Sequence, residues 1–128
     1  MENEVTMIKM VTLIKRKPGM SMEDFIDYYE TNHSKIGEKY LSSHAVRYVR
    51  RYLRPLSDSI MPDTTEDPFY DVVMEIWFPD PSAMEAAFAE LSTAEAQAEI
   101  TEDEARLFDR SRIHSFMVEE HESDLGGA

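Results

Sequence analysis

His33 is a titratable side chain set in an otherwise apolar helical pattern. Apolar residues recur at the spacing of one helical face, at Phe25, Tyr29, Ile36 and Tyr40. The position one turn after Tyr29 should also be apolar, yet it holds His33. Because imidazole titrates near neutral pH, His33 is a candidate general acid or base. The alternative is a core histidine whose nitrogens bond a backbone carbonyl and a hydroxyl.

Two carboxylates, Asp71 and Glu75, lie in YDVVMEIWF, residues 70–78, a segment that alternates as a β-strand does. One face of this strand is uniformly apolar and should pack against helices: Tyr70, Val72, Met74, Ile76 and Phe78. The other face mixes both carboxylates with Trp77, which suits a cavity or an interface. We expect Glu75 to orient His33 or to act as a second base, its pKa raised by burial. A salt bridge to an arginine is the alternative, and for Asp71 it is the favoured one.

Aromatic side chains supply candidate pocket walls. We expect Trp77 and Tyr48, and to a lesser extent Tyr52, to contact a flat ligand, with a tyrosine hydroxyl donating to a carbonyl or a developing oxyanion. Lys9 on the first strand and His114 on the last are further candidates for substrate binding. Alternation leaves open which face of the last strand points inward. Plain packing is the alternative for the aromatic residues.

Turn and capping signals divide the chain into strands and helices. The expected elements are strands at 7–16, 44–56, 70–78 and 112–119, and helices at 22–41, at 83–91 and from there to residue 108. Ser21 fits the N-cap of the first helix, and Asp80 followed by Pro81 fits the start of the second. Thr101 and Glu104 form an internal capping box in the last helical segment.

The resulting order, β-α-β-β-α-β, predicts an α+β fold of the ferredoxin-like type, with an antiparallel four-stranded sheet and helices on one side. The other side of the sheet would present Trp77 among apolar residues. An exposed apolar patch of this kind favours association. A two-fold partner laying its own sheet across the patch would bury both surfaces at once, so we predict a homodimer.

Composition excludes several classes of function. The net charge of -13 repels nucleic acid and anionic membranes, and no segment is apolar and long enough to span a bilayer. Without cysteine there is no disulfide or thiolate site, and no metal-ligand motif occurs, so we expect no metal and no cofactor. We expect a cytoplasmic protein with one domain over residues 1–128 and flexible ends at 1–6 and 121–128. The polar loop at 55–69 is either a lid or a tolerated surface insertion.

The chain resembles the EthD domain family of the dimeric α+β barrel superfamily. The resemblance rests on three segments that cover most of the chain: IKMVTLIKRKPGMSMEDFIDYYETNHSKI, DVVMEIWFPDPSAMEAAF and DEARLFDRSRIHSFMVEEH. It implies two ferredoxin-like protomers whose sheets form a barrel, each subunit enclosing a small-molecule cavity. A histidine stands at the position of His33 in this family. Similar proteins include a lactone isomerase, aromatic cyclases and dehydratases, and the superfamily also holds cofactor-free monooxygenases and haem enzymes.

Residues and resemblance together favour a cofactor-independent enzyme that transfers protons on an aromatic, polyketide-like or lactone compound, as an isomerase, cyclase, dehydratase or other lyase. His33 and Glu75 would be catalytic. Tyr48, Trp77, Lys9 and His114 would bind the substrate. Two alternatives stay open: a non-catalytic protein that binds an intermediate of a degradation pathway, and a cofactor-free monooxygenase.

Overall fold

The computed structural model describes residues 7–56 and 68–126. The expected flexible segment 1–6 and most of the expected loop at 55–69 lie outside these ranges. Within them, four strands form one sheet: β1 (Ile8–Arg16), β2 (Arg47–Tyr52), β3 (Val72–Phe78) and β4 (Phe108–Met117). Their order is β2-β3-β1-β4, and all neighbours are antiparallel. The predicted α+β, ferredoxin-like architecture is confirmed.

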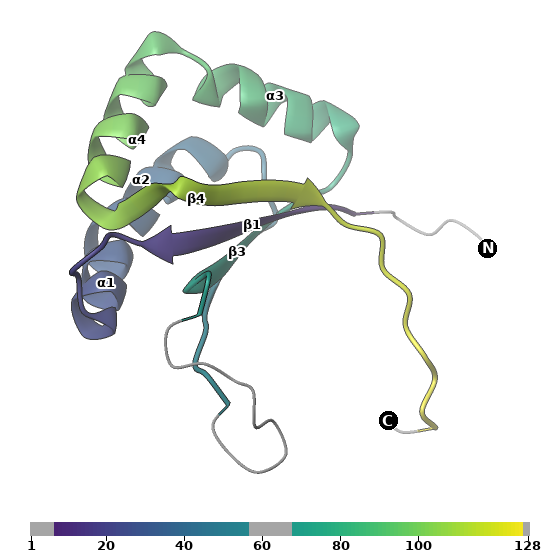
Figure 1. The fold of residues 1–128 in the computed structure, drawn as a ribbon. Helices are drawn as coiled ribbons and strands as arrows, with labels where there is room; N and C mark the ends of the chain where they lie inside the picture. The colour runs from purple at the N-terminus through teal and green to yellow at the C-terminus, as the bar shows by residue number, and fades with distance from the viewer. Residues whose placement is uncertain (1–6, 57–67, 127–128) are drawn as a thin grey trace.

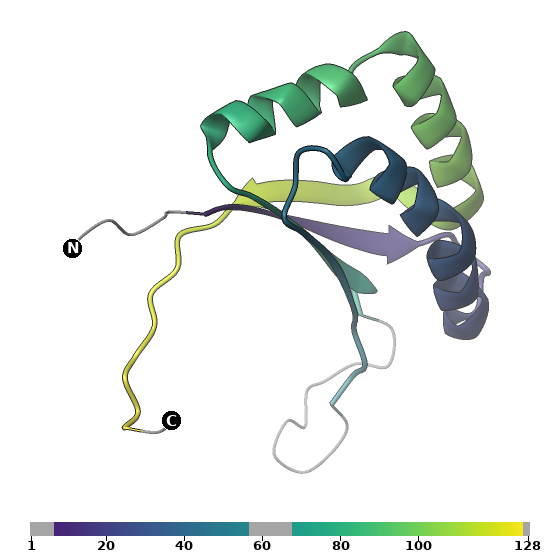
Figure 2. The same ribbon diagram turned by 180° about the vertical axis from the view of Figure 1, so that it is seen from behind.

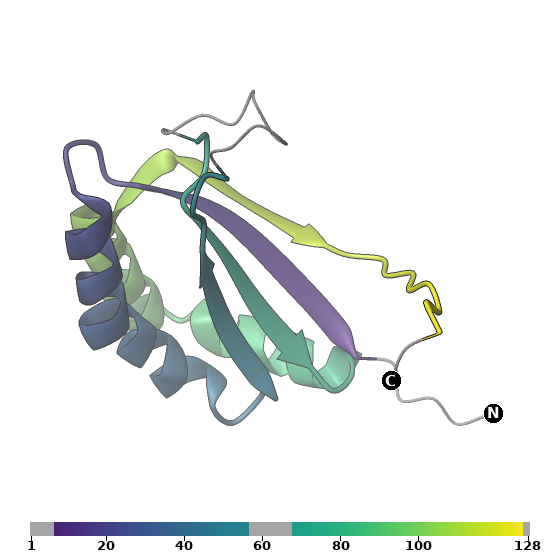
Figure 3. The same ribbon diagram turned by 90° about the horizontal axis from the view of Figure 1, so that it is seen from below.

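All helices cover the same side of the sheet (Figure 1). They are α1 (Met22–Tyr28), a π-helical turn η1 (Tyr29–His33), α2 (Ser34–Leu41), α3 (Pro81–Leu91) and α4 (Ala94–Leu107). Seen from behind and from below, the other side of the sheet carries no helix of the described ranges, and the chain after β4 extends on that side (Figures 2 and 3), where Nζ of Lys9 donates to Oε1 of Glu120 at 2.6 Å. The sheet therefore has one covered face and one open face.

Capping explains where the helices start. The Ser21 hydroxyl accepts a hydrogen bond from the Asp24 amide at 3.0 Å, and the Asp80 carboxylate accepts one from the Ala83 amide at 2.8 Å. Both predicted caps are thus confirmed. The expected capping box at residues 101 and 104 is wrong, because α4 runs unbroken from Ala94 and its cap is the Thr93 hydroxyl.

The expected helix over 22–41 contains a π-helical turn at its centre, Tyr29–His33. Side chains bond the carbonyls around this wider turn: the Thr31 hydroxyl donates to the Asp27 carbonyl at 2.8 Å, and the Ser34 hydroxyl donates to the Glu30 carbonyl at 2.9 Å. Such turns are frequent at functional sites because they change which side chains share a helix face. Here the turn ends at His33.

The Glu30 carboxylate, which lies in this turn, anchors the helix to β2. It accepts hydrogen bonds from Arg50 Nε at 3.0 Å and Arg50 Nη2 at 2.6 Å, and from the Tyr52 hydroxyl. The Arg50 guanidinium holds the pKa of Glu30 below its ordinary value. This pairing fixes the π-helical turn over the sheet.

Alternation along β3 matches the sequence expectation. Val72, Ile76 and Phe78 are buried against the helices, with exposures of 0%, 4% and 0%. The opposite side chains, together with their neighbours in register, make up the open face: Lys9, Val11, Leu13, Arg47, Val49, Arg51, Val73, Glu75, Trp77, His114 and Phe116. Tyr70 departs from the prediction, because its hydroxyl lies 2.9 Å from Nδ1 of His114 on the open face.

Candidate functional site

A cavity of about 270 Å³ lies between the helices and the covered face of the sheet. Most of its wall is apolar: Met10, Ile14, Ile36, Leu41, Met74, Ile76, Leu91, Ile100, Phe108 and Ile113. A few polar side chains converge on the same space: Thr12, Tyr29, His33, Tyr48, Gln97, Glu104 and Ser115. An apolar pocket with a few convergent polar groups is the usual form of a small-molecule site. The cavity is therefore the candidate functional site.

His33 lies in the wall of this cavity with its imidazole in contact with aromatic rings. Its ring centroid is 5.4 Å from that of Tyr29 and 5.1 Å from that of Phe108, both in edge-on geometry. The residue is only 9% exposed. The packing holds the ring in one orientation, as a proton-transfer group requires.

The imidazole of His33 is paired with a buried carboxylate on α4. Its Nδ1 atom lies 2.8 Å from Oδ2 of Asp103, and Asp103 is 5% exposed. An ionised carboxylate only accepts hydrogen bonds, so the proton of a neutral His33 sits on Nδ1. Nε2 then carries the free lone pair, and it makes no hydrogen bond with any residue in the described ranges. This arrangement leaves Nε2 available as a base.

The second oxygen of the Asp103 carboxylate is also bonded. The Tyr28 hydroxyl donates to Oδ1 at 2.5 Å, and Nη1 of Arg106 lies 3.5 Å from the same atom. This hydrogen bond raises the pKa of the Tyr28 phenol. The carboxylate is thus shared between His33 on one side and a phenol with a guanidinium on the other.

Glu104, the residue after Asp103, also lines the cavity. Burial raises the pKa of its carboxyl, and the nearby imidazole of His33 and guanidinium of Arg110 oppose that rise. A carboxyl with a raised pKa can donate a proton nearer to neutral pH than an ordinary glutamate can. Glu104 is therefore a second candidate for acid/base chemistry in the same space.

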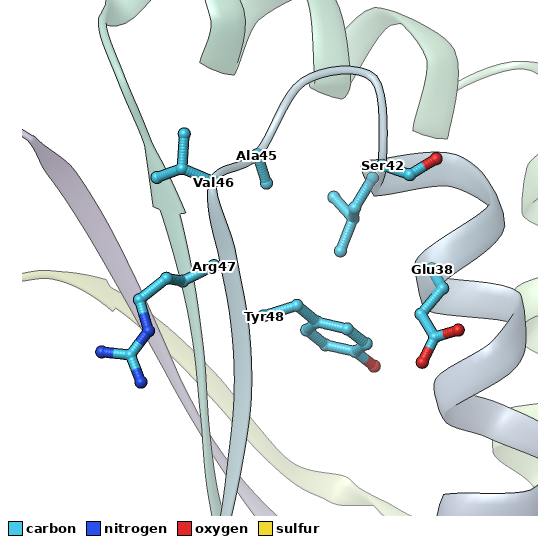
Figure 4. A pocket seen from close by; sticks show the side chains of 7 residues that line it. Glu38, Ser42, Ala45, Val46, Arg47 and Tyr48 are labelled. Carbon is cyan, nitrogen blue, oxygen red and sulfur yellow. The ribbon is translucent and has the colours of Figure 1, made fainter.

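Tyr48 reaches the cavity from β2 and lies directly under α2. Figure 4 shows its ring pointing toward the helix that carries Glu38, while the side chain of Arg47 points the other way. Burial raises the pKa of Tyr48 to about 12, so its hydroxyl stays protonated and can donate. Gly37 makes room for it, because a Cβ atom at that position would lie 2.6 Å from the hydroxyl oxygen of Tyr48. A smaller hollow of about 130 Å³ at the end of α2 shares the Tyr48 ring.

The structure separates the sequence-predicted site residues into two groups. His33 and Tyr48 line the cavity, whereas Glu75, Trp77, Lys9 and His114 lie on the open face. The expectation that Glu75 orients His33 is wrong, because the sheet separates them and Asp103 holds the imidazole. Trp77 and Tyr48 likewise do not share one pocket wall, since neighbouring strands in register place them on opposite faces.

The open-face residues instead bond one another. The Glu75 carboxylate accepts from Nε1 of Trp77 at 2.9 Å and pairs with Arg51. The Trp77 ring lies between two cations, with Nζ of Lys9 3.9 Å and the Arg47 guanidinium carbon 4.5 Å from its centroid. These contacts make a partly charged surface on that side of the sheet.

Sequence reasoning missed Asp103, although a signal was present. Residues Ala96, Ile100, Asp103 and Leu107 follow the spacing of one helical face, so a carboxylate occupies an apolar position just as His33 does. Asp103 lies in an acidic stretch of the sequence, and for this reason it was not distinguished from the residues of a solvent-exposed face. His33 interrupts one apolar helical face and Asp103 interrupts another. Two such polar residues on faces that pack in one core predict that the two side chains bond each other.

Comparisons with known proteins bear on the fold and the family. The EthD domain matches residues 17–111. No curated protein matches the chain. None of the helices in the part that the structure describes has the length and hydrophobicity to cross a lipid bilayer.

Three solved structures illustrate the similarity of fold. An ethyl tert-butyl ether D (EthD) family protein from Bacillus halodurans has a TM-score of 0.61 at 16% identity, over 91% of this chain and 100% of that one. A dimeric ferredoxin-like protein of unknown function from Thermobifida fusca has a TM-score of 0.55 at 12% identity, over 88% and 89%. A hydroxynitrile lyase from Passiflora edulis has a TM-score of 0.54 at 9% identity, over 94% and 100%.

Proposed function

The chain belongs to the EthD domain family, and we propose that it is a cofactor-independent enzyme that transfers protons on a small, mostly apolar, oxygenated substrate. The reaction would be an isomerisation, cyclisation, dehydration or other lyase reaction. One observation carries the proposal: the buried His33–Asp103 pair, 2.8 Å apart, leaves Nε2 without a hydrogen-bond partner in the described ranges, and His33 lies in the wall of a mostly apolar cavity. A histidine held this way is suited to general acid/base catalysis.

In the proposed reaction, Nε2 of His33 removes a proton from a carbon next to a carbonyl group. The electrons of the C–H bond move to the carbonyl oxygen, and the Tyr48 hydroxyl donates a hydrogen bond to the resulting enolate. The Asp103 carboxylate stabilises the imidazolium through Nδ1. Glu104 or His33 then returns a proton at another carbon in an isomerisation, or to the departing oxygen when a leaving group is expelled.

We also propose that a second copy of the chain covers the open face, as the dimeric neighbour supports. That face carries Val11, Val49 and Phe116 beside Trp77, and Phe116 is 51% exposed in the single protomer. A homodimer would remove this apolar surface from water. Trp77, Lys9 and His114 would then contribute to the interface.

Deuterium exchange tests the proposed reaction without a known substrate. The protein is incubated in D₂O with a panel of enolisable lactones, 1,3-diketones and aromatic hydroxynitriles, and exchange or conversion is followed by ¹H NMR and mass spectrometry. With an active panel member, His33→Ala should fold normally and lose about 10²–10⁴-fold in rate, the usual share of general acid/base catalysis. An unchanged rate would remove His33 from the mechanism.

The same samples separate the alternative functions. A binding protein would retain a panel member without exchange or conversion, and His33→Ala would change affinity alone. A cofactor-free monooxygenase would consume dioxygen and lose its activity under anaerobic conditions, which leave a proton-transfer reaction unaffected.

A further inference from the structure

The Asp103 carboxylate holds two donors that reach it from one helical segment. The phenol of Tyr28 donates to Oδ1 at 2.5 Å, and Nδ1 of His33 lies 2.8 Å from Oδ2. We propose that Tyr28 is a positioning residue that sets the basicity of His33 through Asp103. This inference rests on the proposed role of His33 in the function above.

Tyr28 is suited to this role by its packing. Its side chain is half-buried against the core formed by Phe25, Tyr29 and Phe108, while its hydroxyl reaches α4. The Asp103 carboxylate that it meets is nearly enclosed, with 7% of its side chain exposed. In such an environment a hydrogen bond to a carboxylate is stronger than at the surface. Phenylalanine at position 28 would keep the packing and remove only the donor.

Other charged and titratable groups also face the pair. Arg106 approaches Oδ1 of Asp103 at 3.5 Å from α4, and the Glu104 carboxyl lies near the imidazole. Tyr29 touches the imidazole edge-on, and burial raises the pKa of its phenol well above the ordinary value. The pKa of Tyr28 is raised mainly by its bond to Asp103, so the phenol remains a donor at neutral pH.

The direction of the effect follows from the charge on the carboxylate. The Tyr28 hydroxyl takes up part of the negative charge that would otherwise stabilise a protonated His33. When this donor is removed, more of the charge faces Nδ1, and the imidazolium becomes more stable. Tyr28→Phe should therefore increase the proton affinity of His33. A base that binds its proton more tightly is occupied over more of the working range, so the acid limb of the rate profile should move to higher pH.

The chain offers a matched control in Tyr40. Its hydroxyl donates to Oε1 of Glu99 at 2.6 Å and so joins α2 to α4 in the same way, one turn of α4 before Asp103. Tyr40→Phe thus removes a comparable phenol–carboxylate bond to α4, made from α2 and not from the end of α1 where Tyr28 lies, without touching the histidine pair. If Tyr28 has a purely structural role, Tyr28→Phe and Tyr40→Phe should lower the unfolding temperature alike, and neither should shift the titration of His33.

The experiment is a histidine titration on the full chain. Protein labelled with ¹⁵N-histidine is titrated by ¹H–¹⁵N NMR in the wild type, Tyr28→Phe and Tyr40→Phe, and His33→Gln assigns the signal of His33 among the 4 histidines. We expect Tyr28→Phe to increase the proton affinity of His33 by about three- to tenfold and Tyr40→Phe to leave it unchanged. Thermal unfolding of each variant checks that the fold is retained.

The outcomes are distinguishable. If Tyr28→Phe and Tyr40→Phe lower the unfolding temperature alike and neither shifts the His33 titration, the inference is overturned and Tyr28 is structural. If the titration shifts but no panel compound reacts in the wild type, the inference stands and the proposed function fails. If the His33 titration shifts and a panel compound reacts in the wild type, the acid limb of the rate profile should shift together with the titration.

Discussion

Nδ1 of His33 and Oδ2 of Asp103 lie 2.8 Å apart although 70 residues separate them in the chain. The histidine ends the π-helical turn, and the carboxylate comes from the C-terminal half of α4, so the pair exists only where these two elements pack together. Both side chains are almost fully enclosed, with 11% and 7% exposed. Placing two polar groups in a core costs stability, which favours a chemical role over a structural one.

Asp103→Asn should separate orientation from charge. The amide can still reach Nδ1, but it does not fix the tautomer or stabilise an imidazolium, so we expect turnover to fall by about 10–100-fold. Rate measurements on the deuterium-exchange panel check this. Glu99→Gln is the control, because Glu99 lies one turn earlier on α4 and bonds Tyr40 and Lys39 instead of the histidine. Equal rates in the two variants would contradict the role of Asp103.

Glu104→Gln should raise stability at neutral pH while lowering turnover. Burial raises the pKa of Glu104 above its ordinary value of 4.5, so the folded protein resists an ionisation that the unfolded chain undergoes freely. Wild-type stability therefore decreases as the pH rises through 4.5 up to the folded pKa, and glutamine removes this loss. The gain should be present at pH 7 and vanish below the ordinary pKa.

Urea unfolding of the wild type and Glu104→Gln at pH 4 and pH 7 measures this gain. Glu102→Gln is the control, since it makes the same change on α4 at a side chain that is 71% exposed. A gain for Glu104→Gln of equal size at both pH values would show that ionisation is not its cause.

Gly37→Ala should destabilise the protein although alanine favours a helix. The new Cβ atom would lie 2.6 Å from the hydroxyl oxygen and 2.7 Å from Cζ of Tyr48, and so it would force the ring into the cavity. Overpacking of this kind costs about 1–3 kcal/mol. In a Tyr48→Ala background the clash is gone, and the same substitution should stabilise by up to about 1 kcal/mol. Chemical unfolding of the four proteins checks the change of sign, and additive effects would argue against it.

Phe116→Asp should dissociate the proposed homodimer without unfolding the protomer. Phe116 is already 51% exposed on the open face, so a carboxylate there disturbs little within one chain but would be buried in the interface. Sedimentation equilibrium measures the mass of each form. Ala89→Asp, on the exposed surface of α3, is the control and should leave the assembly unchanged. A wild type that sediments as a monomer would remove the interface from consideration.

Local sequence signals predicted most of the fold. Ser21 and Asp80 start helices because their side chains bond amides three residues ahead, so both partners of each interaction lie within a single helical turn. Alternation along residues 72–78 likewise predicted which side chains are buried, since a strand has a period of two, although it misplaced Tyr70 just before the strand. His33 was found because it breaks a helical period. All of these features depend on neighbours in sequence.

The sequence by itself therefore determined the order of elements, their buried faces and the presence of one unusual histidine. Only the tertiary structure decided that the Asp103 carboxylate bonds both His33 and Tyr28. It also decided that the cavity lies between the helices and the sheet, on the face opposite to Glu75. Periodicity states which side chains share a face, but it does not state what that face meets. That depends on contacts between segments far apart in the chain, and packing alone fixes them.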